Sequence, residues 1–348
     1  MIDFRYHLVS IVAVFLALAI GIVLGSTELQ GTTLDALRAL SNRLQSELNA
    51  VETQRNGYEQ QSSASDAFLK TAESKLLDGT LAGDRLVLVT EPGAPSAVVA
   101  GVKQAAALAG AAISGTIALQ PKFNDLSGAT QASLAAINAQ LATSNGQTLT
   151  PASTSQTGYQ QNAAQLIAYA ILDQTADAVG PVTAQAQLVL QAYAQAGFLS
   201  DSGAPWNRAT LAVIVAPGSA PADGANDPAN QVLLALAQEF ATMSAATLVA
   251  GSVAGTTPAG SAISVLRGSS VAGSVSSVDD ADTTLGQIST MWAFATQLAG
   301  GKPNSYGVLG ASAVSPAVPL PVPSVTPSVT STPTQSATGE AGKTVGKK

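Results

Sequence analysis

"RLVLVTEPGAP" at residues 85–95 is the stretch that decides the fold of the central part of this chain. Its continuous apolar run is typical of a buried strand, and the Pro-Gly pair after it predicts a turn. The next residues, "SAVVAGVKQAAALAGAA" (96–112), predict a helix, and "ISGTIALQ" (113–120) predicts a second strand. Two uniformly apolar strands around a helix indicate a β-α-β unit, whose parallel strands are covered on both faces.

The same pattern recurs 125 residues further along the chain. "TLAVIVAPGSAP" (210–221) again has an apolar strand followed by Pro-Gly, a small residue and Pro, and "NQVLLALAQEFATMSAAT" (230–247) predicts its helix. We therefore expect a second, related β-α-β unit. The other elements expected in this half are strands at 261–267 and near 272–278 and a last helix at 284–301.

These two units predict a Rossmann-like α/β head at 84–313. Its halves are about 84–124 and 209–313, and helices rich in Ala and Gln form an insertion at 125–205. The remaining residues, 314–348, are so rich in Pro, Ser and Thr that they cannot bury a core, and we expect a disordered tail.

The two Pro-Gly loops lie at the carboxyl ends of the predicted strands, where parallel sheets bind ligands. Pro92, Gly93, Pro217 and Gly218 are therefore the candidate loop site, although these glycines can equally serve only to turn the chain. Neither loop contains G-x-G-x-x-G or G-x-x-x-x-G-K-[ST], so the sequence predicts no dinucleotide or nucleoside triphosphate site. No acid and base pair stands out, and we do not expect an enzyme.

The residue inventory limits metal and nucleic-acid chemistry. The chain has no Cys and one His, His7, at the edge of an apolar stretch, so thiolate sites and a Ser-His-Asp triad are excluded. We expect no cofactor and no metal site; Asp279 to Asp282, just before the last predicted helix, suggest either a cation or the cap of that helix. A net charge of −7 without a basic stripe argues against binding nucleic acid.

The N-terminus carries a candidate membrane anchor, residues 1–27. From Leu8 to Thr27 no side chain is charged, and these 20 residues would form about 30 Å of helix, the thickness of a bilayer core. A cleaved signal peptide is the alternative, but it usually has a basic start and an A-x-A-like exit, and "VLG" at 23–25 is a marginal site. The pattern favours a retained anchor.

Charges beside the anchor suggest its orientation. Arg5 precedes it and Glu28 follows it, so the positive-inside rule puts the N-terminus in the cytoplasm and the rest of the chain outside. Small residues every four positions lie on one face of the anchor and would let two helices approach closely, although small residues are frequent throughout the chain. This stripe consists of Ala13, Ala17, Gly21 and Gly25.

Residues 28–78 follow as a predicted coiled-coil stalk. Apolar residues fill nine of thirteen heptad core positions, the others being Ser41, Arg55, Ser62 and Ser65. With no Pro between Met1 and Leu81, the membrane helix can continue into a rod of roughly 65 Å that stops at Asp78-Gly79. The predicted core residues are Leu34, Leu37, Leu44, Leu48, Val51, Tyr58, Leu69, Ala72 and Leu76.

The sequence does not decide which chain pairs with the stalk. Glu47 and Glu52 would face each other with like charge in a parallel homodimer, and Arg55 occupies a core position. The stalk therefore pairs with a different chain, or it forms a homo-oligomer whose register shifts near Arg55. A helix that packs along its own head is the other alternative.

The start "MIDFRYHLVSIVAVFLALAIGIVLGS" (1–26), the heptads and "LVLVTEPGA" (86–94) together resemble an actinobacterial family. This is the copper transporter family named for mycobacterial copper transport protein B, MctB, and the resemblance covers residues 1 to about 313. It implies an envelope protein linked to copper homeostasis and proposed to form an outer-membrane channel. Members are also linked, under the name SteB, to cell separation, with a membrane partner that helps control cell-wall hydrolases.

We expect a single-pass protein of the cell envelope that acts in copper homeostasis or efflux as an oligomer, with copper implied by the resemblance alone. The alternative is a non-catalytic coiled-coil scaffold that pairs with a membrane partner to regulate cell-wall hydrolysis. A channel made by a barrel is not favoured, because barrels need at least about eight alternating strands and we count five or six apolar ones. Lys343, Lys347 and Lys348 could contact an anionic wall polymer.

Overall fold

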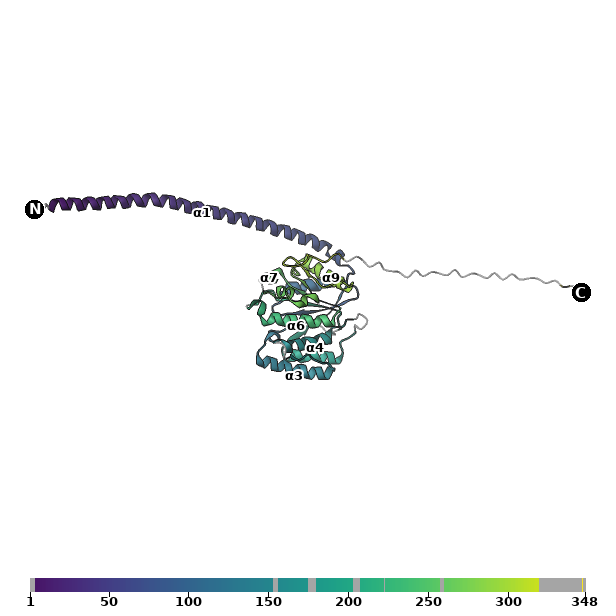
Figure 1. Ribbon diagram of the computed structural model, residues 1–348. Helices are drawn as coiled ribbons and strands as arrows, with labels where there is room; N and C mark the ends of the chain where they lie inside the picture. Colours follow the sequence, from purple (N-terminus) through teal and green to yellow (C-terminus); the bar gives the residue numbers. More distant parts are fainter. Residues whose placement is uncertain are drawn as a thin grey trace.

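The structure is a computed structural model that describes residues 4–152, 156–174, 180–202, 207–221, 223–256 and 260–318, and Gly346. Figure 1 shows one long N-terminal helix, α1 (Phe4–Leu77), extending away from an α/β head. Most of the predicted tail, 314–348, lies outside the described residues.

The head is built on a mixed sheet with the strand order β3-β2-β1-β4-β5-β6-β7 in the described part of the chain. All neighbouring strands pair in parallel except β2 and β3. The strands are β1 (Arg85–Thr90), β2 (Ala112–Leu119), β3 (Leu199–Ser202), β4 (Leu211–Val215), β5 (Ala246–Ala250), β6 (Ser276–Val278) and β7 (Ser305–Tyr306).

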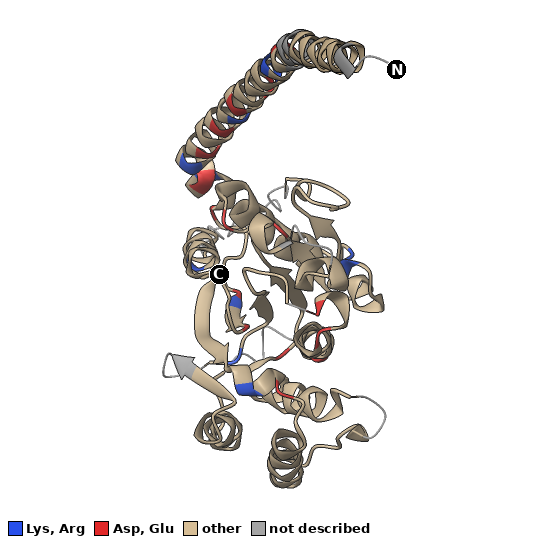
Figure 2. Ribbon diagram, turned by 90° about the vertical axis from the view of Figure 1, so that its left-hand side faces the viewer, with Lys and Arg blue, Asp and Glu red and all other residues tan. Residues whose placement is uncertain are grey.

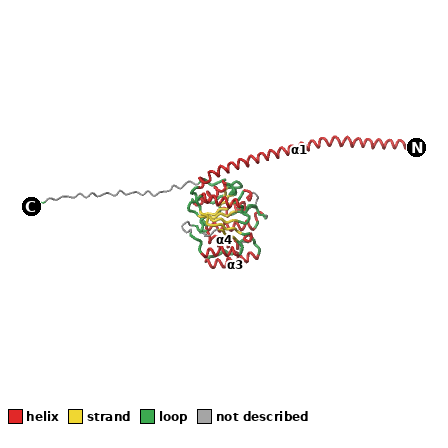
Figure 3. Tube along the Cα trace, turned by 180° about the vertical axis from the view of Figure 1, so that it is seen from behind, coloured by secondary structure: helices red, strands yellow, loops and turns green. Residues whose placement is uncertain are grey.

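Helices cover both faces of this sheet, as Figure 3 shows. Along β1, Leu86 and Leu88 face a core shared with α2, α9 and the end of α1, whereas Val87 and Val89 face a core shared with α3 to α6. Burial on both faces explains why the strands are uniformly apolar, and it confirms the predicted parallel α/β sheet. The helices are α2 (Ser96–Leu108), α3 (Gly128–Asn145), α4 (Gly158–Ile171), α5 (Ala184–Gln195), α6 (Pro228–Met243), α7 (Val253–Thr256), α8 (Ala262–Arg267) and α9 (Thr284–Leu298), with short 3-10 turns at Pro121–Asn124, Gly224–Asn226 and Ser270–Gly273.

One predicted element was wrong, and another was predicted too long. Residues 261–267 form the helix α8 and not a strand, because Ser261 caps its N-terminus by accepting from the Ser264 N–H, and Ile263 and Leu266 are buried at helical spacing. The helix predicted at 230–247 is present as α6, but it stops at Met243, and the residues "ATLVA" form the parallel strand β5. The antiparallel edge strand β3 was not predicted either.

The helix α1 is continuous from the predicted anchor to the head. Within the described residues, one stretch, Tyr6–Gly25, is long and apolar enough to cross a membrane, with a mean hydropathy of 2.9 over 20 residues. Figure 2 shows Lys, Arg, Asp and Glu along the half of α1 nearer the head, whereas the stretch Tyr6–Gly25 contains none of them. The helix ends at Leu77, and Gly79 then adopts a φ of 71°.

The last turns of α1 dock on the head through α9 and α2. The Thr284 N–H of α9 donates to Asp66 Oδ1 at 2.8 Å, and the indole N–H of Trp292 donates to the Leu76 carbonyl at 3.1 Å. Glu73 is buried against the head and accepts from Lys70 at 2.7 Å. The C-terminal turns of α1 are therefore attached to the helices on one face of the sheet.

The predicted coiled-coil positions therefore fall into two groups. Leu76 packs against the core of the head, and Leu69 and Ala72 are half-buried. The alternative that α1 packs along its own head describes these last turns only. The other predicted positions are exposed in the structure, and we call them the exposed heptad row: Leu34, Leu37, Leu44, Leu48, Val51 and Tyr58.

Candidate functional site

The strand order creates a natural binding edge between β1 and β4. The chain leaves β1 toward β2 on one side, and it leaves β4 toward β5 on the other. Connections that diverge in this way open a crevice at the carboxyl ends of the two strands. The structure brings both Pro-Gly loops together there, since the Gly218 N–H donates to the Gly93 carbonyl at 2.9 Å.

Two adjoining cavities lie at this edge, which we call the switch-point pocket. An inner cavity of about 260 Å³ and a wider outer cavity of about 600 Å³ share Glu91, Pro92 and Pro121 as lining residues. Of the predicted loop residues, Pro92 lines both, Pro217 lines the inner one and Gly93 the outer one, whereas Gly218 lines neither. Gly218 instead allows close packing of the two loops, because a Cβ there would lie 2.8 Å from the Pro95 ring.

Glu91 is the chemically distinctive residue of the pocket. It directly follows β1, is 3% exposed, and its Oε2 accepts from the Asn124 side-chain amide at 3.1 Å. Among the described residues, neither Glu91 Oε1 nor Asn124 Oδ1 has a hydrogen-bond partner, although both atoms are buried. Burial raises the pKa of Glu91 to about 7, against the opposing effect of the hydrogen bond from Asn124. Buried polar atoms are usually paired, so two unpaired acceptors at a cavity mark a candidate binding site.

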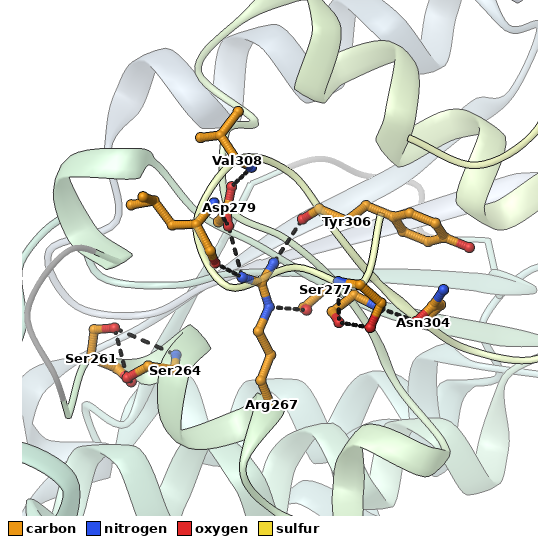
Figure 4. A network of polar contacts seen from close by, with 11 residues as sticks. Ser261, Ser264, Arg267, Ser277, Asp279, Asn304, Tyr306 and Val308 are labelled. Atoms are coloured by element: carbon orange, nitrogen blue, oxygen red, sulfur yellow. Dashed lines mark hydrogen bonds and ion pairs between the residues drawn. The ribbon is translucent and has the colours of Figure 1, made fainter. Parts of the chain in front are cut away.

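Asp279 is a buried carboxylate that directly follows β6 (Figure 4). Unlike Glu91, it has hydrogen-bond partners for both of its oxygens. It accepts from Arg267 at 2.7 Å and from the backbone N–H groups of Val308 and Leu309 at 2.8 and 2.9 Å. Arg267 also donates to the Tyr306 carbonyl and to Ser277 Oγ. This ion pair is fully hydrogen-bonded and serves to fasten the segment after β7 to the sheet.

The acidic run at Asp279 to Asp282 therefore has a structural role different from the predicted cap. Thr283 caps α9 by accepting from the Gly286 N–H, and Asp66 of α1 accepts from the Thr284 N–H. Burial, with the neighbouring charge of Asp279, raises the pKa of Asp280 to about 6. In the part of the chain that the structure describes, no three His, Cys, Asp or Glu side chains lie together as metal ligands.

Sequence patterns identified the place of the pocket but missed its main residues. Glu91 stands in the quoted "TEPGAP", and a lone charge directly after an apolar strand was the available signal. Asn124 carries no such signal, because it reaches Glu91 only through the fold, 33 residues away in sequence. The predicted helix-pairing residues, Ala13, Ala17, Gly21 and Gly25, lie exposed along α1, and their pairing stays a prediction.

Comparison with known proteins covers anchor, long helix and head together. A family model described as "Copper transport outer membrane protein, MctB" matches residues 1–316. The chain belongs to the MctB family. Similar relatives include proteins named copper transporter MctB from Mycobacterium tuberculosis and Mycobacterium bovis, each 31% identical over 324 residues, 91% of this chain and 99% of theirs. The copper transporter MctB of Mycobacterium leprae is 30% identical over 92% of this chain and its own full length.

These matches confirm the family resemblance inferred from the N-terminal motif and the strand. Membership places the chain in a membrane-associated copper transport family, consistent with the candidate span at Tyr6–Gly25. The switch-point pocket lies in the middle of the matched region, within the head of an MctB-family protein.

Glu91→Gln is expected to remove a specific pH dependence of stability. The folded state raises the pKa of Glu91 from its ordinary 4.5 to about 7, so the protonated form stabilises the fold at low pH and this contribution is lost as the pH rises between these values. Relative to the variant, the wild type should lose up to about 3 kcal/mol of unfolding free energy across this window. Denaturant unfolding of the full chain in detergent micelles, near pH 5 and near pH 8, measures the difference.

Glu59→Gln is the matched control for this experiment, because Glu59 is exposed on α1. Burial also raises the pKa values of Asp280 and Asp84. Both residues are present in the wild type and in the two variants, so their contribution to the pH dependence cancels in the comparison. The assignment to Glu91 is contradicted when the wild type and Glu91→Gln show parallel pH profiles.

Proposed function

We propose that this chain is a membrane-anchored envelope protein that acts in copper homeostasis, as part of an efflux assembly in which several chains pair through α1. Two observations support the proposal. The family match extends over nearly the whole chain and includes relatives named copper transporters. The long helix α1 presents the exposed heptad row, which has no partner within the described part of this chain.

The exposed heptad row is what makes an assembly the favoured state. Its six side chains are 49–63% exposed, and they recur at the 3-4 spacing of a coiled coil. Complete burial of one such apolar side chain contributes about 1.5–3 kcal/mol, so pairing of two helices along this row would outweigh the cost of association. An isolated helix in water would leave the same surface exposed and would gain little stability from it.

A single copy also provides too little membrane structure for transport. Tyr6–Gly25 is the one candidate span among the described residues, and one helix encloses no path for an ion. The stripe of Ala13, Ala17, Gly21 and Gly25 would allow close helix pairing in lipid. We propose that copper, the cargo, passes through or is handled by the assembly and that the chain itself is not an enzyme.

The proposed orientation has the N-terminus in the cytoplasm and the head outside the membrane, following the charge of Arg5 before the apolar stretch. In this arrangement α1 would hold the head away from the bilayer. The basic residues at the end of the tail, Lys343, Lys347 and Lys348, would then lie on the side of the cell wall, where an anionic polymer could attract them.

A second candidate function is a scaffold that pairs with another membrane protein and regulates cell-wall hydrolysis and cell separation. Arg55 at a core position and the like charges of Glu47 and Glu52 favour a partner of different sequence. Ion pairs within α1, Arg43–Glu47 at 2.9 Å and Arg55–Glu59 at 3.3 Å, reduce this effect. Exposed pairs of this kind contribute at most about 1 kcal/mol. The charge pattern is therefore compatible with a second copy of this chain and with a different protein as the partner.

Removal of the chain from its host tests the copper function directly. A deletion strain should hold more copper per cell and grow less well in high copper than its parent, and the full chain should restore both. The double variant Leu44→Asp/Leu48→Asp should behave like the empty vector, because two charges disrupt the exposed heptad row. Ser46→Asp, which adds a charge on the opposite face of α1, should restore like the wild type.

The two candidate functions give different results in this experiment. Unchanged copper content and growth in the deletion strain would contradict the copper function. Chains of unseparated cells with normal copper content, corrected by the wild type and not by Leu44→Asp/Leu48→Asp, would establish the scaffold instead.

A further inference from the structure

The inner end of the switch-point pocket is built to accept hydrogen bonds. Glu91 Oε1 and Asn124 Oδ1 are both buried and unpaired within the described residues, and both belong to groups that accept when Glu91 is ionised. The bond from Asn124 Nδ2 to Glu91 Oε2 fixes the two side chains side by side. A ligand that satisfies them must supply N–H or O–H donors, and a positively charged donor would also pair with the carboxylate.

The walls of the inner cavity are mostly apolar. Pro92, Pro121, Pro217 and Pro221 form much of the lining, and proline has no backbone N–H. Asn230, also in the lining, has its amide donor engaged by the carbonyls of Gly224 and Gly260. The inner cavity therefore combines a carboxyl group with apolar walls, which suits an ammonium group on a short aliphatic body.

The outer cavity has the opposite electrostatic character. It contains Lys103, which forms no ion pair among the described residues, and Ser96 at the first turn of α2. The N-cap position of α2 is Pro95, which has no side-chain capping bond, so the first N–H groups of this 13-residue helix lack a side-chain acceptor. The positive end of the helix and the Lys103 ammonium both favour an anionic group.

The two cavities are neighbours at this edge of the sheet, because Glu91, Pro92 and Pro121 line both of them. We propose that the switch-point pocket binds a small zwitterion, such as an ω-amino acid or a dipeptide. Its ammonium group donates to Glu91 and Asn124 in the inner cavity, and its carboxylate lies toward Lys103 and the N-terminus of α2. This proposal is independent of the copper function, which does not use the pocket.

Binding of four probes to the full chain in detergent micelles tests the proposal. Isothermal titration with γ-aminobutyrate and glycylglycine should show saturable binding, and n-butylamine and butyrate, which carry only one of the two charges, should bind more weakly. Glu91→Gln should lower the affinity for both zwitterions and for butylamine by at least about tenfold, as expected for the loss of a charge-assisted hydrogen bond. Lys103→Met should lower the affinity for the zwitterions and leave the affinity for butylamine unchanged.

Lys302→Met is the matched control, because Lys302 is an exposed lysine that lines neither cavity. The unfolding measurements on Glu91→Gln show separately that this variant is folded. Absence of binding by both zwitterions would overturn the proposal, and so would equal affinity in the wild type and Glu91→Gln. Butyrate binding as tightly as γ-aminobutyrate would overturn the assignment of the inner cavity to an ammonium group.

Discussion

Arg267→Ala should lower the free energy of unfolding of the head by about 3–5 kcal/mol, the effect expected when one partner of a buried ion pair is removed. Asp279, which is fully buried, would lose the guanidinium that pairs with it. The carbonyl of Tyr306 and the hydroxyl of Ser277 would also lose a donor. The segment after β7 depends on the same network, because Val308 and Leu309 donate to Asp279.

Denaturant unfolding of the full chain in detergent measures this loss, followed by tryptophan fluorescence in a Trp206→Phe background so that Trp292 of α9 gives the signal. Arg38→Ala is the matched control, since Arg38 forms an exposed ion pair with Asp35 at 3.2 Å and its removal should cost less than about 1 kcal/mol. Arg267→Lys keeps the charge but not the planar fork, so its stability should lie between those of the wild type and Arg267→Ala. Equal stability of Arg267→Ala and Arg38→Ala would show that the network does not hold the head together.

A single cysteine on the exposed heptad row should give near-complete disulfide dimers in the membrane if copies of this chain pair in register. The natural chain has no Cys, so Leu44→Cys or Leu48→Cys introduces the only thiol. Side chains at core positions of a parallel pair face each other closely enough to form the bond. Mild oxidation of membranes, followed by non-reducing electrophoresis, measures the dimer fraction.

Two further cysteines make this experiment discriminating. Ser46→Cys lies on the opposite face of α1 and should stay monomeric. Leu76→Cys should also stay monomeric, because Leu76 packs on the head, even though heptad spacing alone places it in the paired core. Monomers at Leu44→Cys and Leu48→Cys, or crosslinks of these thiols to a different protein, would contradict the homo-oligomer and favour the scaffold.

Local patterns predicted the elements whose residues interact with near neighbours in sequence. The strand β1 was predicted from its continuous apolar run before a Pro-Gly turn, and the uninterrupted helix α1 from its 3-4 spacing of apolar residues without proline, and both signals are visible in the chain itself. Prediction failed at α8 and β5, where short apolar runs are compatible with either helix or strand. There the choice depended on the Ser261 cap and on an open place beside β4, and the second of these exists only in the folded sheet.

The sequence by itself determined that this chain has an apolar N-terminal helix, a parallel α/β head and the features of the MctB family, because periodicity and composition are local properties. Only the tertiary structure decided which residues of α1 remain exposed, that Arg267 and Asp279 neutralise each other, and that Glu91 meets Asn124 at the edge between β1 and β4. These contacts join residues far apart along the chain. Their existence depends on strand order and helix docking, which no local period encodes.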